Sequence, residues 1–235
     1  MGLFRLFNSK HSLIDSGVLK GSTDRHSHIL YGVDDGIKTL EDSLAVLAFE
    51  ESLGVKEVWC TPHIMEDVPN TTQSLRNRFE ELCSQYNGTI KLRLAAEYML
   101  DTVFIDRFKA NDLLLMQNDT ILVETSTIVP PYDLVGMLGQ IMSDGLTALL
   151  AHPERYRFLE IDDILQMREN GVALQLNIAS VTGYYGKSVR TKAEALLAKG
   201  AYSVFGSDCH RLMSLMEQYS RPELTKKTIN NLNLI

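Results

Sequence analysis

Five of the six histidines in this chain lie in short motifs beside apolar runs. The motifs are DRHSHIL, VWCTPH, TALLAHPER and SVFGSDCH, and the histidines are His26, His28, His63, His152 and His210. Histidine is the commonest metal-ligating side chain, and its neutral imidazole binds a metal at physiological pH. These residues therefore indicate a metal site assembled from distant parts of the chain.

Four carboxylates occur at similar places in the sequence, namely Asp35, Glu97, Glu124 and Asp208. A carboxylate at the end of an apolar run is unfavourable unless it is paired or bound to a metal. Taken one at a time, such residues are more often core histidines or members of salt bridges. The joint pattern instead predicts one polynuclear site, and its nitrogen and oxygen ligands favour Mn, Fe, Zn or Mg over a zinc–thiolate site.

The HxH motif carries geometric information. Side chains alternate along a strand, so His26 and His28 are expected on the same face. Asp24 shares that face, and we expect its carboxylate to orient one of the imidazoles as a hydrogen-bond acceptor.

Arg155 follows His152 by three residues in HPERYRF and is expected to project over the metal site. A guanidinium suits bidentate binding of phosphate and stabilises charge on a transferring phosphoryl group. The alternative role is a surface ion pair with Glu154 or Glu160. Hard-ligand metals beside an arginine indicate hydrolysis of a phosphate ester, with water activated by the metals as the nucleophile.

Other classes of protein lack their signatures here. None of the three cysteines has an arginine six positions later, as a thiolate-based phosphatase needs, and there is no G-x-S-x-G or G-x-x-x-x-G-K-[ST] motif. The net charge of −7 argues against nucleic acid as the main partner. Unpaired cysteine spacing and the lack of a long apolar stretch predict a cytoplasmic protein that does not span a membrane.

The candidate ligands must be held by an alternation of strands and helices. Strands are expected at 22–29, 55–60, 91–96, 120–124, 146–151, 172–178 and 202–207. Helices are expected at 39–53, 72–86, 102–109, 132–144, 160–170, 187–199 and 222–231. Gly54, Gly145, Gly171 and Gly200 each follow a helix, where a left-handed cap is wanted. Apolar strands that alternate with helices predict a parallel β/α fold.

Two arrangements of such strands compete, a closed barrel and an open doubly wound sheet. The candidate ligands stand at the carboxyl ends of six different strands, which converge on one face only in a barrel. We therefore expect a seven-stranded barrel in a single domain at 21–235, preceded by an N-terminal extension at 1–20.

The motifs DRHSHILYGVDDG, VWCTPH, AAEYMLD, ILVETS, LLAHPERY and SVFGSDCH resemble, in order, those of the PHP (polymerase and histidinol phosphatase) superfamily. More narrowly, they resemble its bacterial tyrosine-phosphatase branch of the CpsB/CapC/YwqE type, which is tied to capsule and exopolysaccharide synthesis. The resemblance covers roughly residues 22–210. It implies a distorted, TIM-barrel-like (β/α)7 barrel.

The resemblance also implies three divalent metal ions, often manganese. Asp208, His26 and His28 would hold the first, with Glu97 bridging to a second that Glu124 and His152 complete, while Asp35, His63 and His210 would hold the third. Arg155 matches the arginine that binds the substrate phosphate, and Arg211 is a candidate second arginine. The implied substrate is phosphotyrosine in the tail of a bacterial tyrosine kinase.

Other functions are open at this stage. One is a PHP-type metallohydrolase that acts on a small phosphate ester or phosphodiester. Another is a non-catalytic module that binds a kinase through residues 1–20 and the last helix, although an intact set of metal ligands argues against it. A homo-oligomer is compatible with all of these functions.

Overall fold

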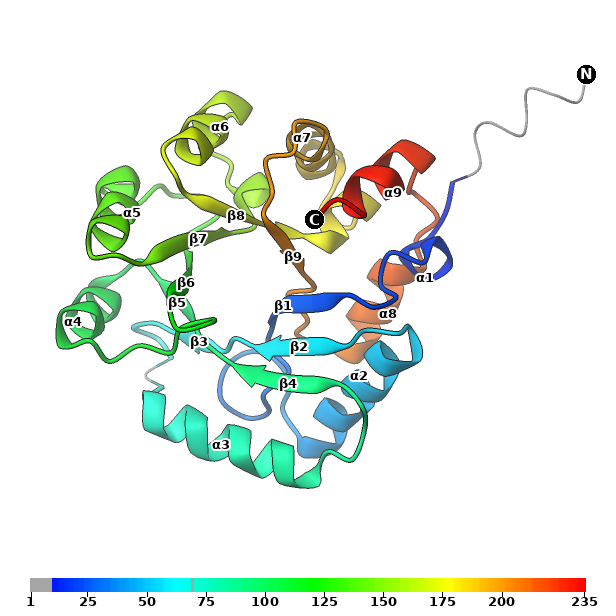
Figure 1. The fold of residues 1–235 in the computed structure, drawn as a ribbon, viewed down its shortest axis with the longest axis horizontal. Coiled ribbons are helices and arrows are strands. Elements are labelled where there is room, and N and C mark those ends of the chain that lie inside the picture. Colours follow the sequence, from blue (N-terminus) through cyan, green and yellow to red (C-terminus); the bar gives the residue numbers. More distant parts are fainter. Residues whose placement is uncertain (1–9, 69) are drawn as a thin grey trace, which may run out of the picture.

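The computed structural model describes residues 10–68 and 70–235, so the first nine residues of the expected N-terminal extension lie outside the described residues. Strands alternate with helices along most of the chain (Figure 1). The strands are β1 (Thr23–Ser27), β2 (Glu57–Cys60), β3 (His63–Ile64), β4 (Lys91–Leu94), β5 (Glu97–Met99), β6 (Thr120–Glu124), β7 (Thr147–Ala151), β8 (Ala173–Asn177) and β9 (Val204–Gly206). The α-helices are α1 (Leu13–Ser16), α2 (Leu40–Ser52), α3 (Thr72–Gln85), α4 (Thr102–Ala110), α5 (Leu134–Ser143), α6 (Ile161–Glu169), α7 (Lys187–Ala198), α8 (Leu212–Ser220) and α9 (Lys226–Leu232). Two short 3-10 helices, η1 (Pro153–Arg155) and η2 (Ile178–Thr182), follow β7 and β8.

The strands pair in parallel within two sheets, of order β1-β2-β4 and β3-β5-β6-β7-β8-β9. This differs from the single sheet of seven strands that the sequence predicts. The run expected at 55–60 continues after Thr61 and Pro62 as β3, and the run expected at 91–96 ends at Leu94 as β4, with a further strand, β5, beginning at Glu97. Proline has no N–H for a sheet ladder, which explains the first interruption.

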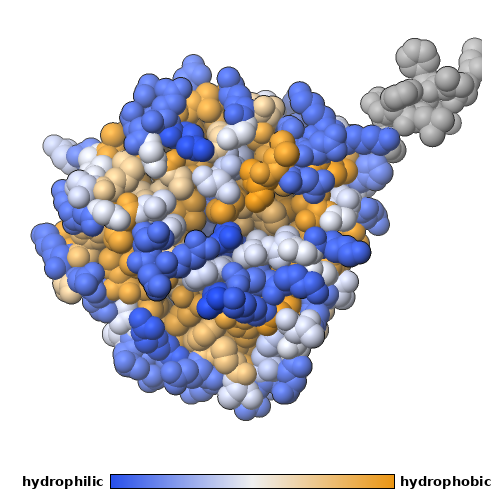
Figure 2. Space-filling model, in the orientation of Figure 1, coloured by the Kyte–Doolittle hydropathy of each residue, from blue (hydrophilic) through white to orange (hydrophobic). Residues whose placement is uncertain are grey.

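The first strand, β1, and the chain that follows the last strand, β9, are joined by backbone hydrogen bonds. The amide of Asp208 donates to the carbonyl of His26 at 2.7 Å, and the amide of His28 donates to the carbonyl of Cys209 at 3.0 Å. Strands therefore surround the centre of the molecule, and the larger helices lie outside them (Figure 1). In the space-filling view, hydrophilic residues form most of the outline and hydrophobic residues show between them (Figure 2).

The apolar core has an inner and an outer part. The inner cluster, enclosed by the strands, consists of Trp59, Ala95, Met116, Leu122, Leu149 and Ala151. The outer cluster is larger and packs the strands against the helices. Leu13, Val18 and Leu19 belong to the outer cluster, so residues 10–20 of the expected extension contribute to the core.

Local sequence signals explain where most helices begin and end. The side chains of Thr39, Thr71 and Asp101 accept hydrogen bonds from amides in the first turns of α2, α3 and α4. The four glycines expected after helices all have positive φ, as predicted. Helices α1 and α8 lie outside the predicted helices, and the cap residue of α8, Arg211, makes no side-chain cap bond. Among the described residues, none of the helices combines the length and apolarity needed to cross a membrane.

Candidate metal centre

The structure brings all nine candidate ligands together at the carboxyl ends of the strands. His26 lies in β1, His63 follows β2 and begins the short β3, Glu97 follows β4 and begins the short β5, and Glu124 ends β6, while the others lie in the loops that follow β1, β7 and β9. With Arg155, they surround or underlie a cavity of about 300 Å³. A larger hollow of about 750 Å³ lies along β4, but no histidine or aspartate lines it. The chemistry suggested by the sequence therefore belongs to the smaller cavity.

The floor of this cavity is a buried cluster of imidazoles and carboxylates. The Nε2 atoms of His26 and His28 lie 3.2 Å apart, and each is 3.2 Å from Oε2 of Glu97. Oδ1 of Asp208 is 3.6 Å from Nε2 of His26 and 3.4 Å from Nε2 of His28. Across the cavity floor, Nε2 of His152, which follows β7, is 3.2 Å from Oε1 of Glu97.

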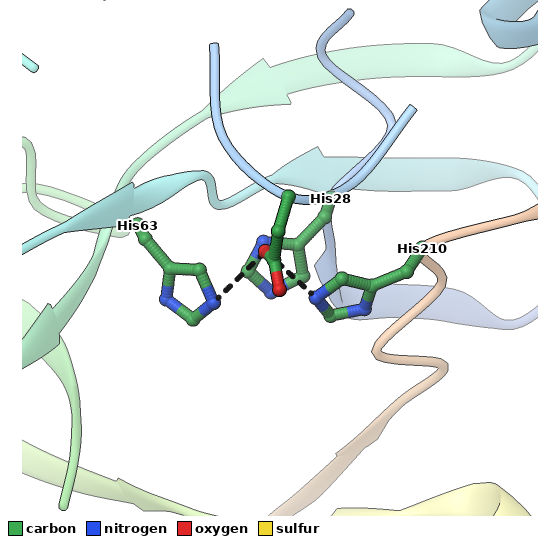
Figure 3. A group of neighbouring side chains, drawn as sticks. His28, His63 and His210 are labelled. Carbon is green, nitrogen blue, oxygen red and sulfur yellow. Dashed lines mark ion pairs between the residues drawn. The ribbon is translucent and has the colours of Figure 1, made fainter. Parts of the chain in front are cut away.

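A second cluster lies closer to solvent. The rings of His28, His63 and His210 face one another from separate parts of the chain (Figure 3). Oδ1 of Asp35 is 3.3 Å from Nε2 of His210 and 3.6 Å from Nε2 of His63. The Asp35 side chain is 71% exposed, so this cluster forms the entrance to the cavity.

Four groups of side chains place their ligand atoms within 4.8 Å of one another. The groups are His28, Asp35, His63 and His210; His26, His28 and Asp208; His26, Glu97 and His152; and His63, Glu97 and Glu124. The grouping differs in detail from the one that the resemblance implies. His28 also joins the outer group, and Glu124 is grouped with His63, while its Oε2 also lies 3.7 Å from Nε2 of His152.

The electrostatics of the floor favour bound cations. Burial alone would raise the pKa of Glu97, but the charge of His26 and the close approach of His152 and His28 hold it well below its usual value. Burial likewise opposes ionisation of Asp208, whose pKa is nevertheless lowered by His26, His28 and Arg155. In return, the charges of Glu97 and Asp208 overcome burial and raise the pKa of His26 to about 9. Carboxylates that stabilise protons on these imidazoles would also stabilise metal ions.

Several buried polar atoms in the cluster have no hydrogen-bond partner among the described residues. They are both carboxylate oxygens of Glu97 and the Nδ1 atoms of His63 and His152. Buried polar groups are rarely left unsatisfied in native proteins. Because nitrogen and oxygen donors of this kind suit Mn, Fe, Zn or Mg, the residues present fit a group of divalent ions.

Residues outside the predicted set orient the imidazoles. Oδ2 of Asp34 is 2.8 Å from Nδ1 of His28 and accepts from the amide of His63 at 3.0 Å. Oε1 of Gln175 is 3.1 Å from Nδ1 of His26. Such partners fix the ring and tautomer of a ligating histidine. The only sequence signal for Gln175 is a polar residue within the apolar strand ALQLN.

The expected role of Asp24 is wrong. Its carboxylate accepts hydrogen bonds from the amide of His26 and from the amide and hydroxyl of Ser207, not from an imidazole. It therefore joins β1 to the end of β9. At the same junction, a Cβ on Gly206 would lie 2.4 Å from that of His26, so only glycine fits there.

Two of the candidate ligands have strained backbones. His152 has φ 33° and Asp208 has φ 54°, in the left-handed region that L-residues rarely adopt. Such strain costs of order 1–3 kcal/mol and is concentrated at functional sites. The turns at these two residues aim their side chains into the cluster.

Arg155 lies at the end of η1, at the wall of the cavity. Its Nη1 is 2.6 Å from Oδ2 of Asp208, and its guanidinium lies 4.6 Å from the centre of the Tyr185 ring. Asn177 donates to both Asp208 (3.0 Å) and the Tyr185 hydroxyl (3.1 Å). The alternative ion pair with Glu154 does not form, since Glu154 is buried and accepts from other residues.

The structure does not bring Arg211 to the cavity. It is exposed at the start of α8, directly after His210, and is not among the residues that line the cavity wall. Tyr185, which the sequence did not indicate, occupies the position beside Arg155 instead.

The sequence matches the family described as "Capsular polysaccharide synthesis, CpsB/CapC" over residues 22–228. It is 23% identical over 220 residues to the putative tyrosine-protein phosphatase CapC of Staphylococcus aureus, covering 90% of this chain and 83% of that protein. It is 27% identical over 205 residues to the tyrosine-protein phosphatase CpsB of Streptococcus pneumoniae, covering 81% of this chain and 84% of the relative.

Solved structures share the fold. The crystal structures of YwqE from Bacillus subtilis and CpsB from Streptococcus pneumoniae, described as unique metal-dependent tyrosine phosphatases, include a chain that superposes with a TM-score of 0.77 at 21% identity. That match covers 90% of this chain and 86% of the other. The phosphotriesterase homology protein of Escherichia coli superposes with a TM-score of 0.57 at 15% identity, covering 92% of both chains.

Proposed function

Because the chain belongs to the CpsB/CapC family of capsular polysaccharide synthesis, we propose that it is a metal-dependent protein-tyrosine phosphatase. Its relatives CapC, CpsB and YwqE are named as tyrosine-protein phosphatases and match most of its length. The substrate would be phosphotyrosine in the tail of a bacterial tyrosine kinase that controls capsular or exopolysaccharide synthesis. The observation that carries the proposal is the buried imidazole–carboxylate cluster with Arg155 at its edge.

We propose that the cluster holds three divalent ions, with manganese preferred. The ligands would be the nine residues of the sequence prediction, and the overlap of the four groups at His26, His28, His63 and Glu97 supports neighbouring ions that share ligands. Bound ions would supply positive charge to the phosphoryl oxygens and activate water as the nucleophile.

The chain itself would bind and orient the phosphoryl group through Arg155. In the free protein, Asp208 and Tyr185 hold the guanidinium at the cavity wall, so little side-chain freedom remains to be lost on binding. A planar guanidinium can donate two parallel hydrogen bonds to phosphoryl oxygens. The buried surroundings strengthen this interaction relative to water.

The cysteines offer no competing nucleophile. Burial raises the pKa of the Cys60 and Cys209 thiols, and it also raises that of Cys83. The reactive form in a cysteine phosphatase is the thiolate, which these environments disfavour at neutral pH. Water is therefore the nucleophile that this site supports.

We also infer that the two sheets represent one distorted (β/α)7 barrel, in a single domain with residues 1–20 as an extension. Counting β2 with β3, and β4 with β5, as interrupted strands gives seven positions around the centre. Hydrogen bonds from the amide of Ala95 to Cys60 (3.0 Å) and from the amide of Glu97 to Pro62 (3.1 Å) support this interpretation.

Cytoplasmic location and homo-oligomerisation remain predictions. All three cysteines are free, which supports a reducing compartment for the protein.

The proposal is tested with a panel of substrates on protein loaded with Mn²⁺. The panel contains a phosphotyrosine peptide, the same peptide with phosphoserine, a sugar phosphate, a phosphodiester and p-nitrophenyl phosphate. We expect preference for phosphotyrosine, loss of turnover with chelator and recovery with Mn²⁺. Preference for the sugar phosphate or the diester would instead identify a small-ester hydrolase, and activity that survives chelation would refute metal dependence.

A further inference from the structure

The two sides of the cavity differ in chemistry. Arg155 and Asp208, in the loops after β7 and β9, form a charged side. Met65 and Val68, after β3, and Met99, at the end of β5, are the apolar residues of the lining. Since β3, β5 and β6 are consecutive neighbours in the sheet, the apolar side borders on the loop that follows β6.

That loop exposes an unusual number of large apolar side chains. Ile128 and Val129 are 62% and 64% exposed, and Tyr132 is fully exposed, while Val135 in the first turn of α5 is 59% exposed. We call Ile128, Val129 and Tyr132 the rim patch. Contiguous exposed apolar side chains on a soluble protein commonly mark an interaction site. The loop begins directly after Glu124, a candidate metal ligand that lines the cavity, so the rim patch lies four to eight residues along the chain from that lining.

The loop is held in place rather than free. The amide of Arg157, two residues after Arg155, donates to the carbonyl of Thr127 at 2.9 Å. The hydroxyl of Ser126 accepts from the amides of Ile128 and Val129. Two consecutive prolines, Pro130 and Pro131, then restrict the backbone of the turn. A preorganised surface loses little entropy when it binds a partner.

We propose that the rim patch binds the polypeptide around the phosphotyrosine, through apolar side chains that flank the modified residue. The phosphoryl group would lie at Arg155, the phenyl ring against Met65 and Met99, and the flanking chain on the rim patch. This inference rests on the proposed phosphatase function. It assigns a recognition role to the rim patch because the patch belongs to the loop after β6, and β6 is the sheet neighbour of β5, which supplies Met99 to the apolar side of the cavity.

The test compares the double variant Ile128→Ser/Val129→Ser with the wild type. The matched control is Leu234→Ser, which alters a side chain 82% exposed near the C-terminus. The probes are p-nitrophenyl phosphate, a phosphotyrosine peptide with leucines on both sides, and the same peptide with serines. We expect the wild type to prefer the leucine peptide, and the double variant to lose about tenfold in kcat/KM for it, mostly through KM. Turnover of p-nitrophenyl phosphate, which has no flanking residues, should stay within about twofold.

Several outcomes would overturn the inference. One is equal use of the leucine and serine peptides by the wild type. Another is an unchanged KM for the leucine peptide in the double variant, or the same loss for p-nitrophenyl phosphate. If sedimentation shows a wild-type dimer that the double variant loses, a second copy of the chain covers the rim patch instead. Failure of the phosphatase function itself would look different, because Mn²⁺-loaded wild type would then turn over neither phosphotyrosine peptide.

Discussion

Two groups of buried carboxylates lie near strand β1, and their pKa values are shifted in opposite directions. In the metal centre, the pKa values of Glu97 and Asp208 are held low by imidazoles and by Arg155, in spite of burial. In the second group, burial raises the pKa of Asp24 to about 6, and hydrogen bonds from Ser207 offset this only in part. Burial and the charge of Asp24 raise the pKa of Glu50 well above its usual value.

The difference shows that burial of carboxylates does not by itself make a metal site. The imidazoles that face the first group keep its carboxylates ionised, so these carboxylates can bind cations. The second group faces hydrogen-bond donors such as Ser207 and Tyr219, whose hydroxyl lies 3.5 Å from Oε1 of Glu50. The protonated form of Glu50 is favoured there, and the group spans β1, α2 and α8.

The largest effect is expected for Asp208→Asn, with Glu50→Gln as the matched control in the second group. Loss of the Asp208 charge leaves Arg155 and two imidazoles without their shared partner. We expect kcat/KM for p-nitrophenyl phosphate to fall by about 10³-fold or more, together with the ion content. Glu50→Gln should retain both. Equal losses in the two variants would remove the distinction between the groups.

A smaller effect is expected for Arg155→Ala, which separates phosphate binding from metal binding. Removal of one charged donor from a buried site should lower kcat/KM by about 10²-fold, while the ion content stays the same. Kinetics and elemental analysis on the same preparation measure both quantities. Arg157→Ala, at the exposed neighbouring arginine, is the control and should behave as wild type. An active Arg155→Ala protein would show that another group binds the phosphate.

Glu50→Gln should change stability rather than activity. The pKa of Glu50 is higher in the folded state than in the unfolded chain, because the carboxyl is buried beside Asp24. Stability of the wild type is therefore present below the unfolded value and falls as the pH rises toward the folded value, by about 1.4 kcal/mol per pH unit. Glutamine does not titrate. The free energy of unfolding of the variant, measured with urea in the presence of chelator, should therefore rise relative to that of the wild type from pH 4 to pH 8. A pH-independent difference would contradict this.

The smallest effect concerns Tyr185 as a positioning residue for Arg155. Tyr185→Leu removes the aromatic face beneath the guanidinium, which is worth about 0.5–1 kcal/mol, or a two- to fivefold loss in kcat/KM. Tyr185→Phe keeps the face and should restore most of the activity. If Phe and Leu are equally impaired, the hydroxyl that Asn177 contacts matters instead of the ring.

The sequence was sufficient to find the candidate ligands because most of them stand at the end of a strand or just after one, and parallel strands end on one face. Strands β6 and β7 and helices α2 and α3 lie within one residue of their predicted bounds. The residues that orient the ligands could not be predicted in this way. Asp34, Gln175 and Tyr185 acquire their roles from partners 6, 149 and 30 positions away, and nothing in their own segments specifies those partners.

Asp24 is a case in which the sequence predicted a role that the structure contradicts. Strand alternation placed it with His26 and His28, but the register of β1 against β2 shifts between Asp24 and Ser27. The carboxylate therefore reaches Ser207 instead of an imidazole. The division of the strands around Pro62 and around Ala95 was likewise not evident from apolar runs alone.

The most direct measurement determines divalent ions and phosphotyrosine turnover on one purified sample, before chelation, after chelation and after return of Mn²⁺. If the imidazole–carboxylate cluster is the catalytic metal centre, turnover should fall with the ion content and return with it, and Asp208→Asn should lack both throughout. Full turnover in a sample without ions would contradict the assignment.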